Sequence, residues 1–320
     1  MKKIEILDKI SKISIYLLVF LIPIFFLPFT QNVLDYPKQV LLISLVSISL
    51  ICQIIKFLIE GKISFSFHPF HFIVLVFLLV FSLSTLFSKS KTESFFGFPL
   101  TISQSFLTIL FLTLLYFLIN SIFEKKEIFF LLFFFSVSIL LAALFSTLQI
   151  FGKFILPFDF SKQTSFNTIG TQNSLAILLT SLAFLFLILF SISKRLIKFF
   201  FLILTLLSIF FLLLLNFKIS FLLLLISSVI FLGFLTTKKE IFSSVLLIFS
   251  LFFLAISVSL LLFDLRIFPV QIPFEVSLGQ RLSFEIALKS LKENPIFGSG
   301  PSTYLYQFLK HKGTALNETA

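Results

Sequence analysis

Nine long apolar runs are the feature that most limits what this chain can fold into. They lie at residues 10–29, 40–59, 70–87, 100–119, 128–150, 174–192, 199–215, 219–234 and 241–263. Most are close to the ~20 residues that a helix needs to cross a bilayer. In hydrocarbon the backbone must satisfy its own hydrogen bonds, and a strict period-2 alternation is absent, so the runs predict helices. We therefore expect an all-α, polytopic integral membrane helix bundle of about nine transmembrane helices.

The composition excludes several other classes of protein. Hydrophobic residues make up 58% of the chain and charged residues 12%, and a soluble domain cannot bury so much apolar surface. The net charge is +11, but the basic residues lie between the apolar runs, as topology signals do, so we expect no nucleic-acid partner. The single cysteine, Cys52, cannot form an intrachain disulfide. We expect neither a metal nor a cofactor.

The distribution of basic residues predicts how the chain is oriented. With a cytoplasmic N-terminus and nine spans, 13 Lys and Arg residues fall inside and 6 outside before residue 264, as the positive-inside rule requires. Only residues 216–218 separate the seventh and eighth runs. One helix over both runs would be ~54 Å long, too long for one crossing, and merging them would place Lys238 and Lys239 outside. We therefore expect two spans joined by a tight turn.

A change of composition near residue 264 divides the chain into two parts. Residues 1–263 form the predicted transmembrane bundle, and residues 264–320 the start of a large extracytoplasmic loop. Pro269 and Pro273 disfavour regular structure there, and a short helix is expected from Ser277 to just before Pro295. Apolar and charged residues fall on different faces of this helix: Phe284, Ala287, Leu288 and Leu291 on one, and Arg281, Glu285, Lys289 and Lys292 on another. The spacing alone is satisfied by an amphipathic helix at the membrane interface, with its charged side in water.

Two polar stretches outside the spans are candidates for a binding site. In "FGSGPS", Gly298 and Gly300 allow a turn with positive φ. The Lys-Ser/Thr of a phosphate-binding P-loop is absent, and a backbone nest for an anion remains an alternative. In "NTIGTQNSLA", Thr171 or Asn173 could cap the sixth predicted span, or the stretch could form a polar wall for a headgroup or a sugar.

The residues from 279 to 304 resemble the O-antigen ligase and O-antigen polymerase superfamily of bacterial glycan enzymes. Its members typically show an Arg, an aromatic residue (usually Trp) three positions later, an Ala, and then "P-lfGxGxgxf". This chain has Arg281, Phe284, Ala287, Pro295, Ile296, Phe297, Gly298, Gly300 and Tyr304 at matching spacing. "NTIGTQNSLA" is also similar to the Gly-x-x-Asn start of a middle span in this family. Members have about a dozen helices and a large extracytoplasmic loop, which agrees with the predicted layout.

The resemblance implies a membrane glycosyltransferase of the bacterial cytoplasmic membrane. It would transfer a glycan from a polyprenyl diphosphate carrier to a glycan, lipid or protein acceptor, in surface polysaccharide or glycoconjugate biosynthesis. Arg281 would be the main catalytic cation that binds the diphosphate, and Lys218 the second. Lys218 stands where the family often has an Arg in a short turn, although Lys lacks the bidentate fork. Gly298, Gly300 and Asn173 would contact substrate.

The resemblance also implies structural roles and a missing group. Phe284 and Pro295 would be anchors, and the apolar face of the helix would dock on the bundle so that Arg281 faces the site. The family's catalytic His lies later in the loop than residue 320. We therefore expect the chain to be a truncated fragment that is inactive alone.

Three alternatives remain open at this point. A glycan polymerase of the same superfamily shares these motifs with a ligase. A lipid-linked sugar flippase or another transporter is a different class, against which the scarcity of ionisable residues inside the spans counts. A non-catalytic membrane scaffold is the third.

Overall fold

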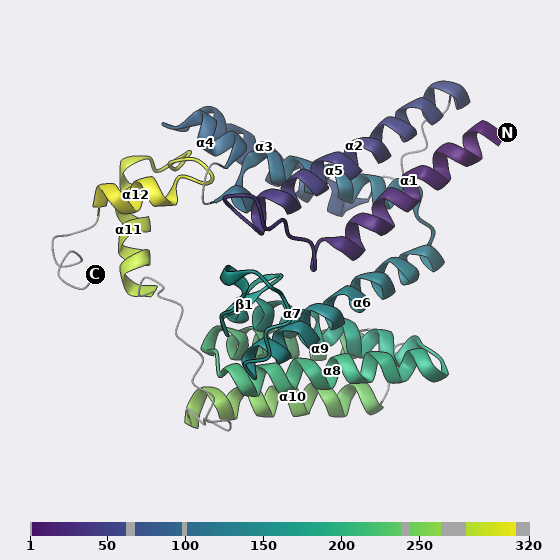
Figure 1. Ribbon diagram of the computed structural model, residues 1–320, viewed down its shortest axis with the longest axis vertical. Coiled ribbons are helices and arrows are strands. Elements are labelled where there is room, and N and C mark those ends of the chain that lie inside the picture. Colours follow the sequence, from purple (N-terminus) through teal and green to yellow (C-terminus); the bar gives the residue numbers. More distant parts are fainter. Residues whose placement is uncertain (1, 62–67, 98–100, 238–243, 264–279, 312–320) are drawn as a thin grey trace. The chain divides into compact units, whose positions relative to one another are not determined.

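The computed structural model describes residues 2–61, 68–97, 101–237, 244–263 and 280–311, with the side chains of residues 2, 280 and 281 left out. Its helices and strands form two compact units (Figure 1), Met1–Ser138 with Val276–Ala320 and Ile139–Glu275. We call these the first and the second unit, and each is described by itself.

Helices are the regular elements found among the described residues of the first unit. Its elements are α1 (Lys2–Leu21), α2 (Asp35–Glu60), α3 (Pro69–Leu86), α4 (Lys91–Phe96), η1 (Ile102–Gln104), α5 (Phe106–Ile122), the first half of α6 (Lys125–Ile150), α11 (Gln280–Glu293) and α12 (Tyr304–His311). A core of aliphatic residues from α1, α2 and α5 holds it together, among them Ile15, Leu18, Leu42, Val46 and Leu118.

The second unit is a helical bundle with one small hairpin. It contains the rest of α6, then η2 (Asp159–Ser161), β1 (Phe166–Asn167), β2 (Gly170–Thr171), α7 (Gln172–Ile192), α8 (Arg195–Leu215), α9 (Lys218–Thr237) and α10 (Ser244–Phe263). The two strands pair antiparallel. Leucines and phenylalanines form the core: the rings of Phe184 and Phe231 lie 4.8 Å apart, and those of Phe184 and Phe253 5.3 Å apart.

Buried serines fill the spaces beside these large side chains. Ser208 donates a hydrogen bond to the carbonyl of Leu204 at 2.9 Å, and Ser228 donates to that of Leu224 at 2.6 Å. Ser250 and Ser257 on α10 each donate to the carbonyl three residues earlier. Each hydroxyl is thus satisfied inside its own helix, so serine acts here as a small residue that lets helices approach closely.

The apolar helices identify a multi-pass membrane protein. Among the described residues, seven helices are long and apolar enough to cross a bilayer: α2, α3, α6, α7, α8, α9 and α10. Each of the nine predicted runs coincides largely with a helix, but α1 begins with a charged stretch and α5 has only 17 residues. The count of nine spans stays a prediction.

The structure corrects two predicted boundaries and confirms one turn. The first apolar run continues to residue 29, yet α1 ends at Leu21, because Pro23 and Pro28 interrupt the run. The fourth run begins at residue 100, but α5 begins at Phe106, where Ser105 accepts a hydrogen bond from the Thr108 amide at 3.3 Å. Between α8 and α9 the chain turns as expected. Asn216 takes the left-handed conformation (φ +47°) that ends α8.

Candidate functional site

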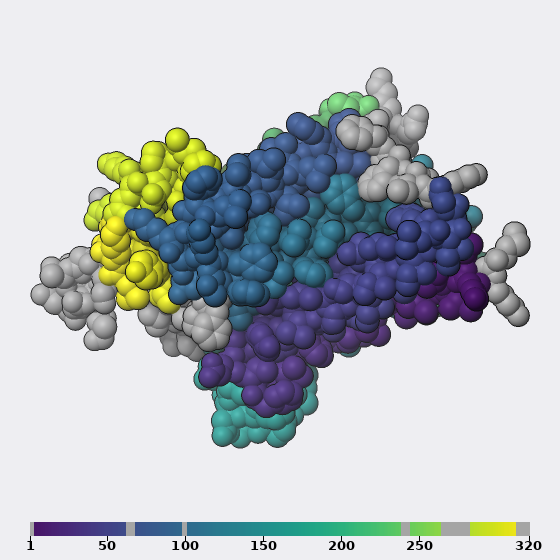
Figure 2. Space-filling view, turned by 90° about the horizontal axis from the view of Figure 1, so that it is seen from above, coloured from purple at the N-terminus to yellow at the C-terminus, as the bar shows by residue number. Residues whose placement is uncertain are grey.

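One end of the first unit collects the predicted C-terminal motif. There α12 and its connection to α11 lie near the C-terminal end of α3 and near α4, and α11 extends away from them (Figure 1). In Figure 2 the C-terminal residues, drawn in yellow, cover part of the blue surface formed by these helices. We call residues 297–303 the glycine turn, since they contain both Gly298 and Gly300.

Hydrogen bonds attach the glycine turn to α3. Ser84 Oγ donates to the carbonyl of Phe297 at 2.7 Å, and Ser88 Oγ donates to that of Ser299 at 3.0 Å. The Ser88 and Ser94 hydroxyls are 2.6 Å apart. Ser84 and Ser88 are more than 200 residues away from the glycine turn in sequence. The attachment is therefore a tertiary contact.

Further contacts fix the two edges of the turn. Thr101 Oγ1 donates to the carbonyl of Ser302 at 2.9 Å, and Ser302 Oγ donates back to the carbonyl of Thr101 at 2.8 Å. At the other edge the rings of Phe87 and Phe297 stack with centroids 4.2 Å apart. The glycine turn is therefore a docked element, held by backbone carbonyls that accept from serine and threonine.

The two glycines have different surroundings. Both have positive φ, +67° at Gly298 and +102° at Gly300, as the sequence predicts. A Cβ added at Gly300 would lie 2.3 Å from Ser88 Oγ and 2.5 Å from Ser94 Oγ, whereas one at Gly298 would meet nothing within 4 Å. Gly300 is thus explained by close packing of the chain on itself. Substrate contact by either glycine stays a prediction.

The amphipathic helix forms, but it docks through a different face from the predicted one. α11 runs from Gln280 to Glu293 and ends before Pro295, as expected, while residues 277–279 lie outside the described part. Phe284 is 64% exposed and Leu291 50% exposed, and Ala287 and Leu288 are exposed as well. The buried side chains are Ile286 (1% exposed) and Ser290 (8% exposed).

The apolar stripe of Phe284 and its neighbours is therefore exposed among the described residues of the first unit, and its docking on the bundle stays a prediction. The exposure of this stripe is explained by the small size of the contact that Ile286 and Ser290 make. An i, i+4 stripe of one isoleucine and one small serine allows close approach, and it leaves the wider apolar stripe free. Pro295 is also exposed. It follows the end of α11, and its role as an anchor stays a prediction.

The predicted substrate-contacting residues divide between the two units. Arg281 lies in the first turn of α11, and its side chain is outside the described part of the chain. Lys218 is the first residue of α9 and is exposed. Asn173 is half-buried near the start of α7. Arg281, Gly298 and Gly300 thus belong to the first unit, and Lys218 and Asn173 to the second.

Three basic groups converge on one carboxylate beside the glycine turn. Glu293 at the end of α11 pairs with Lys310, with His311 Nε2 at 3.3 Å and with Lys89 at 3.7 Å. The hydrogen bond from Lys310 is the main cause that lowers the pKa of Glu293. These pairs connect α11 to α12 and to the segment after α3. They also show that basic side chains gather at this end of the unit.

In the second unit, carboxamides organise the loop before α7. Gln172 Nε2 donates to the carbonyls of Thr164 (3.0 Å) and Phe166 (3.3 Å), and its Oε1 accepts from Ser146. Gln149 Nε2 donates to the carbonyl of Ser161 at 2.9 Å. Sequence reasoning singled out Asn173 and missed its neighbour Gln172, which is 1% exposed. The sequence signal for these carboxamides is weak: Gln149 lies near the end of one apolar run, and Gln172 lies just before the next.

The cap of α7 is confirmed. Thr171 Oγ1 accepts a hydrogen bond from the Ser174 amide at 3.2 Å. Asn173, the alternative cap, lies already inside the helix. The stretch "NTIGTQNSLA" is therefore well explained as the start of a helix under an ordered loop, and its predicted contact with a sugar stays a prediction.

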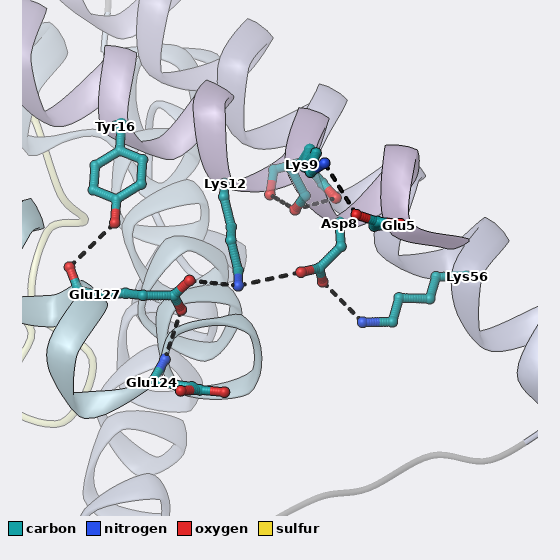
Figure 3. A network of polar contacts seen from close by, with 10 residues as sticks. Glu5, Asp8, Lys9, Lys12, Tyr16, Lys56, Glu124 and Glu127 are labelled. Carbon is teal, nitrogen blue, oxygen red and sulfur yellow. Dashed lines mark hydrogen bonds and ion pairs between the residues drawn. The ribbon is translucent and has the colours of Figure 1, made fainter. Parts of the chain in front are cut away.

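A second polar cluster joins α1, α2 and α6 at their charged ends. Lys12 lies between the carboxylates of Asp8 (3.2 Å) and Glu127 (2.7 Å), and Asp8 also pairs with Lys56 at 2.8 Å (Figure 3). Tyr16 donates to the carbonyl of Glu127 at 3.2 Å. The cluster lines an open pocket of about 530 Å³. Its charges compensate one another, so we interpret it as a clamp between helices.

The Asp8 carboxyl shows how strongly this clamp is balanced. Burial raises the pKa of Asp8, but the hydrogen bonds and charges of Lys56 and Lys12 outweigh burial and leave the pKa below its ordinary value. Sequence reasoning treated these lysines as topology signals only. Among the described residues, no group of His, Cys, Asp and Glu could hold a metal ion.

The clamp and the glycine turn lie at opposite ends of α2. Gln39, near the start of α2, donates to Ser105 Oγ and Thr108 Oγ1 at 3.0 and 2.9 Å, close to the surface that receives the turn. Lys56, 17 residues later, lies in the clamp, ~26 Å away along the helix. The N-terminus and the C-terminal motif are therefore at opposite ends of the spans in this unit. Which end is cytoplasmic stays a prediction.

Comparison with known proteins adds no family to this geometry. No protein-family model, no curated protein and no solved structure matches the chain. The likeness to glycan enzymes therefore rests on the residues between 279 and 304 and on "NTIGTQNSLA".

Proposed function

We propose that the chain belongs to a membrane glycosyltransferase of the O-antigen ligase-related type. It transfers a glycan from a polyprenyl diphosphate carrier to an acceptor hydroxyl at the end of the first unit that carries α11 and the glycine turn. The observation that supports this proposal most is the docking of that turn: the motif residues from Pro295 to Tyr304 are attached to the end of α3, a candidate span.

The position suits a lipid-linked donor. A polyprenyl chain lies in hydrocarbon and its diphosphate lies at the interface, so the site must lie where a lipid-facing helix ends. Of the 18 residues of α3, only His71 and Thr85 are buried. Phe87, directly after the helix, stacks on Phe297 of the glycine turn. The apolar surface of α3 thus leads directly to the motif.

The transfer needs positive charge and a base. The bond between the anomeric carbon and the diphosphate oxygen breaks, and polyprenyl diphosphate leaves with the electron pair. The acceptor oxygen bonds to the same carbon, and its proton passes to a general base. Fixed cations stabilise the negative charge that develops on the leaving group. In this proposal Arg281 binds the diphosphate through its fork of N–H donors, and Lys89 and Lys310 add positive charge nearby.

Substitution of Arg281 in the full-length protein tests the proposal. The variants Arg281→Ala and Arg281→Lys are reconstituted in proteoliposomes with lipid-linked glycan extracted from the host's own membranes. We expect Arg281→Ala to lose about 100-fold or more in transfer rate, the effect of removing one donor to a developing charge. Arg281→Lys should keep part of the rate. Lys153→Ala, which removes an exposed cation from the second unit, is the control and should be unchanged.

Two results would contradict the proposal. Transfer at the wild-type rate by Arg281→Ala, with normal amounts of protein in the membrane, would remove Arg281 from the mechanism. If the wild-type protein transfers no glycan from the host's own lipid-linked pool to any acceptor in the host's extract, the transferase assignment itself fails.

A further inference from the structure

α11 has three faces: one is buried in the protein, one is charged and suited to water, and one is apolar and exposed. With 100° per residue, Ile286 and Ser290 lie on one side of the helix, and Glu285, Lys289 and Lys292 lie about a third of a turn away. The first pair is buried, on a helix that packs against α12, and the second set is exposed. The third side carries Phe284, Ala287, Leu288 and Leu291, which we call the apolar face of α11.

The apolar face is exposed although its residues are among the most hydrophobic of the segment. Phe284 is 64%, Leu288 40% and Leu291 50% exposed. Ile296, just after the helix, is 84% exposed and extends the same apolar surface along the chain. Since Ile286 and Ser290 already fix how the helix is seated, the apolar face cannot turn inward without losing that contact. It requires an apolar partner other than the described residues of the first unit.

The orientation and position of α11 indicate what that partner is. In Figure 1, α11 runs across the direction of α1, α2 and α5, so its axis lies along the plane that these helices cross. Phe297, four residues after its end, stacks on Phe87 at the point where α3 ends. The exposed side chains of α3, such as Leu79 and Leu86, make that helix lipid-facing. The end of α11 therefore lies at the depth where α3 leaves the hydrocarbon.

We propose that α11 lies on the surface of the bilayer that the spans cross, with its apolar face inserted among phospholipid acyl chains. An amphipathic helix of 14 residues with a lysine-bearing polar side is the kind that binds at the headgroup boundary and does not span. Lys289 and Lys292 border the inserted face, and their ammonium groups reach the phospholipid phosphates while their alkyl stems cover apolar surface. The partner is thus phospholipid, and neither a second copy nor another protein is needed to cover the face.

This attachment goes beyond the proposed transfer reaction and does not depend on it. It makes the bilayer itself one of the supports of the glycine turn. The hairpin of α11 and α12 is held to the protein by the serine and glutamate contacts described above, and to the lipid by the apolar face. A lipid-attached α11 keeps the motif residues at the level of the headgroups.

Lipid contact can be measured one residue at a time. Cys52 is the only cysteine among these 320 residues, so the Cys52→Ala variant of this 320-residue chain accepts single cysteines labelled with an environment-sensitive fluorophore. Labels replace Leu288 and Leu291 on the apolar face and, as matched positions one residue away, Lys289 and Lys292. The proteins are reconstituted in vesicles of phosphatidylcholine and phosphatidylglycerol, with or without bromine on the acyl chains. Leu79 on α3 is the positive control.

The proposal predicts a periodic result. Brominated lipid should quench the labels at positions 288 and 291 about as strongly as the label at position 79. The labels at 289 and 292 should be quenched by aqueous iodide instead. Quenching of positions 288 and 291 by iodide would show that the face lies in water, and quenching by neither agent would show that a protein segment or a second copy covers it. Either outcome overturns the proposal.

A second measurement needs no substitution. A phospholipid with a photoreactive diazirine high on its acyl chain is mixed into the same vesicles with the wild-type protein. After illumination, mass spectrometry should find adducts on Phe284, Leu288 or Leu291. Adducts on α3 without any on α11 would overturn the proposal.

Discussion

Replacing Gly300 with alanine should release the glycine turn from the first unit. The added Cβ would lie 2.3 Å from Ser88 Oγ, 2.6 Å from Ser88 Cβ and 2.5 Å from Ser94 Oγ. The two serines are buried and bonded to each other, so neither hydroxyl can withdraw without breaking a hydrogen bond. The turn must move away instead, and the contacts of Ser84 and Ser88 with its carbonyls are then lost.

The size of the effect follows from a comparison with Gly298. Both glycines have positive φ, so alanine at either position meets a backbone penalty of about 1–2 kcal/mol. Only Gly300→Ala adds overpacking, which costs about 1–3 kcal/mol. Since each 1.4 kcal/mol is a factor of ten, the turn should open about 5- to 150-fold more often in Gly300→Ala than in Gly298→Ala.

Hydrogen exchange of the protein in nanodiscs measures this opening. Amides of residues 297–311 should lose protection in Gly300→Ala, while those in the core of α2 keep it, because the opening is local. Adding Ser94→Ala should recover part of the loss by removing one of the clashing atoms. Equal protection in Gly298→Ala and Gly300→Ala would refute the packing argument.

Three further variants test the clamp, the loop and the helix turn. Asn216→Val should reduce stability by about 1–2 kcal/mol because a β-branched residue is strained at positive φ, and Asn216→Gly should not, as measured by unfolding in mixed micelles. The pKa of Asp8 is lower in the folded protein than its ordinary 3.8, so its contribution is complete above that value and is lost as the pH falls through the folded pKa. Asp8→Asn should therefore flatten the acid limb of stability against pH, and an unchanged limb would contradict the clamp. Gln172→Met should loosen the loop by about 1–3 kcal/mol because two partly buried carbonyls lose their donor, whereas exchange in the exposed control Gln163→Met should match wild type.

The helices of this chain are readable from its sequence, but their ends are less so. Apolar runs predict helices because hydrocarbon leaves the backbone no other partners. Apolar residues also occur in loops at the membrane interface, and hydropathy alone does not distinguish such loops from helices. The apolar run that contains most of α1 continues past Pro23, and the run that contains α5 includes six residues before the helix begins. In both places a local signal, a proline or a capping serine, decided the boundary.

The candidate site shows a sharper division between local and tertiary information. Positive φ at Gly298 and Gly300 is a local property, and the sequence predicts it correctly. That only Gly300 is packed depends on Ser88 and Ser94, which are over 200 residues away. Likewise, periodicity finds the apolar face of α11. It does not show that Ile286, on another face, is the side chain that becomes buried.

The buried serines of α8, α9 and α10 have a consequence for how this protein can evolve. Because the hydroxyls of Ser208, Ser228 and Ser257 are occupied within their own helices, a change of these serines to alanine strands no polar partner on the facing helix. At such a site, only the volume of the side chain affects the packing of its neighbours. A gain of size at Ser228 would have to be matched by a loss opposite it, for example at a phenylalanine. Divergence in this unit should therefore proceed by compensated exchanges of bulk, with large and small residues trading places across the helix contacts while the path of the backbone is kept.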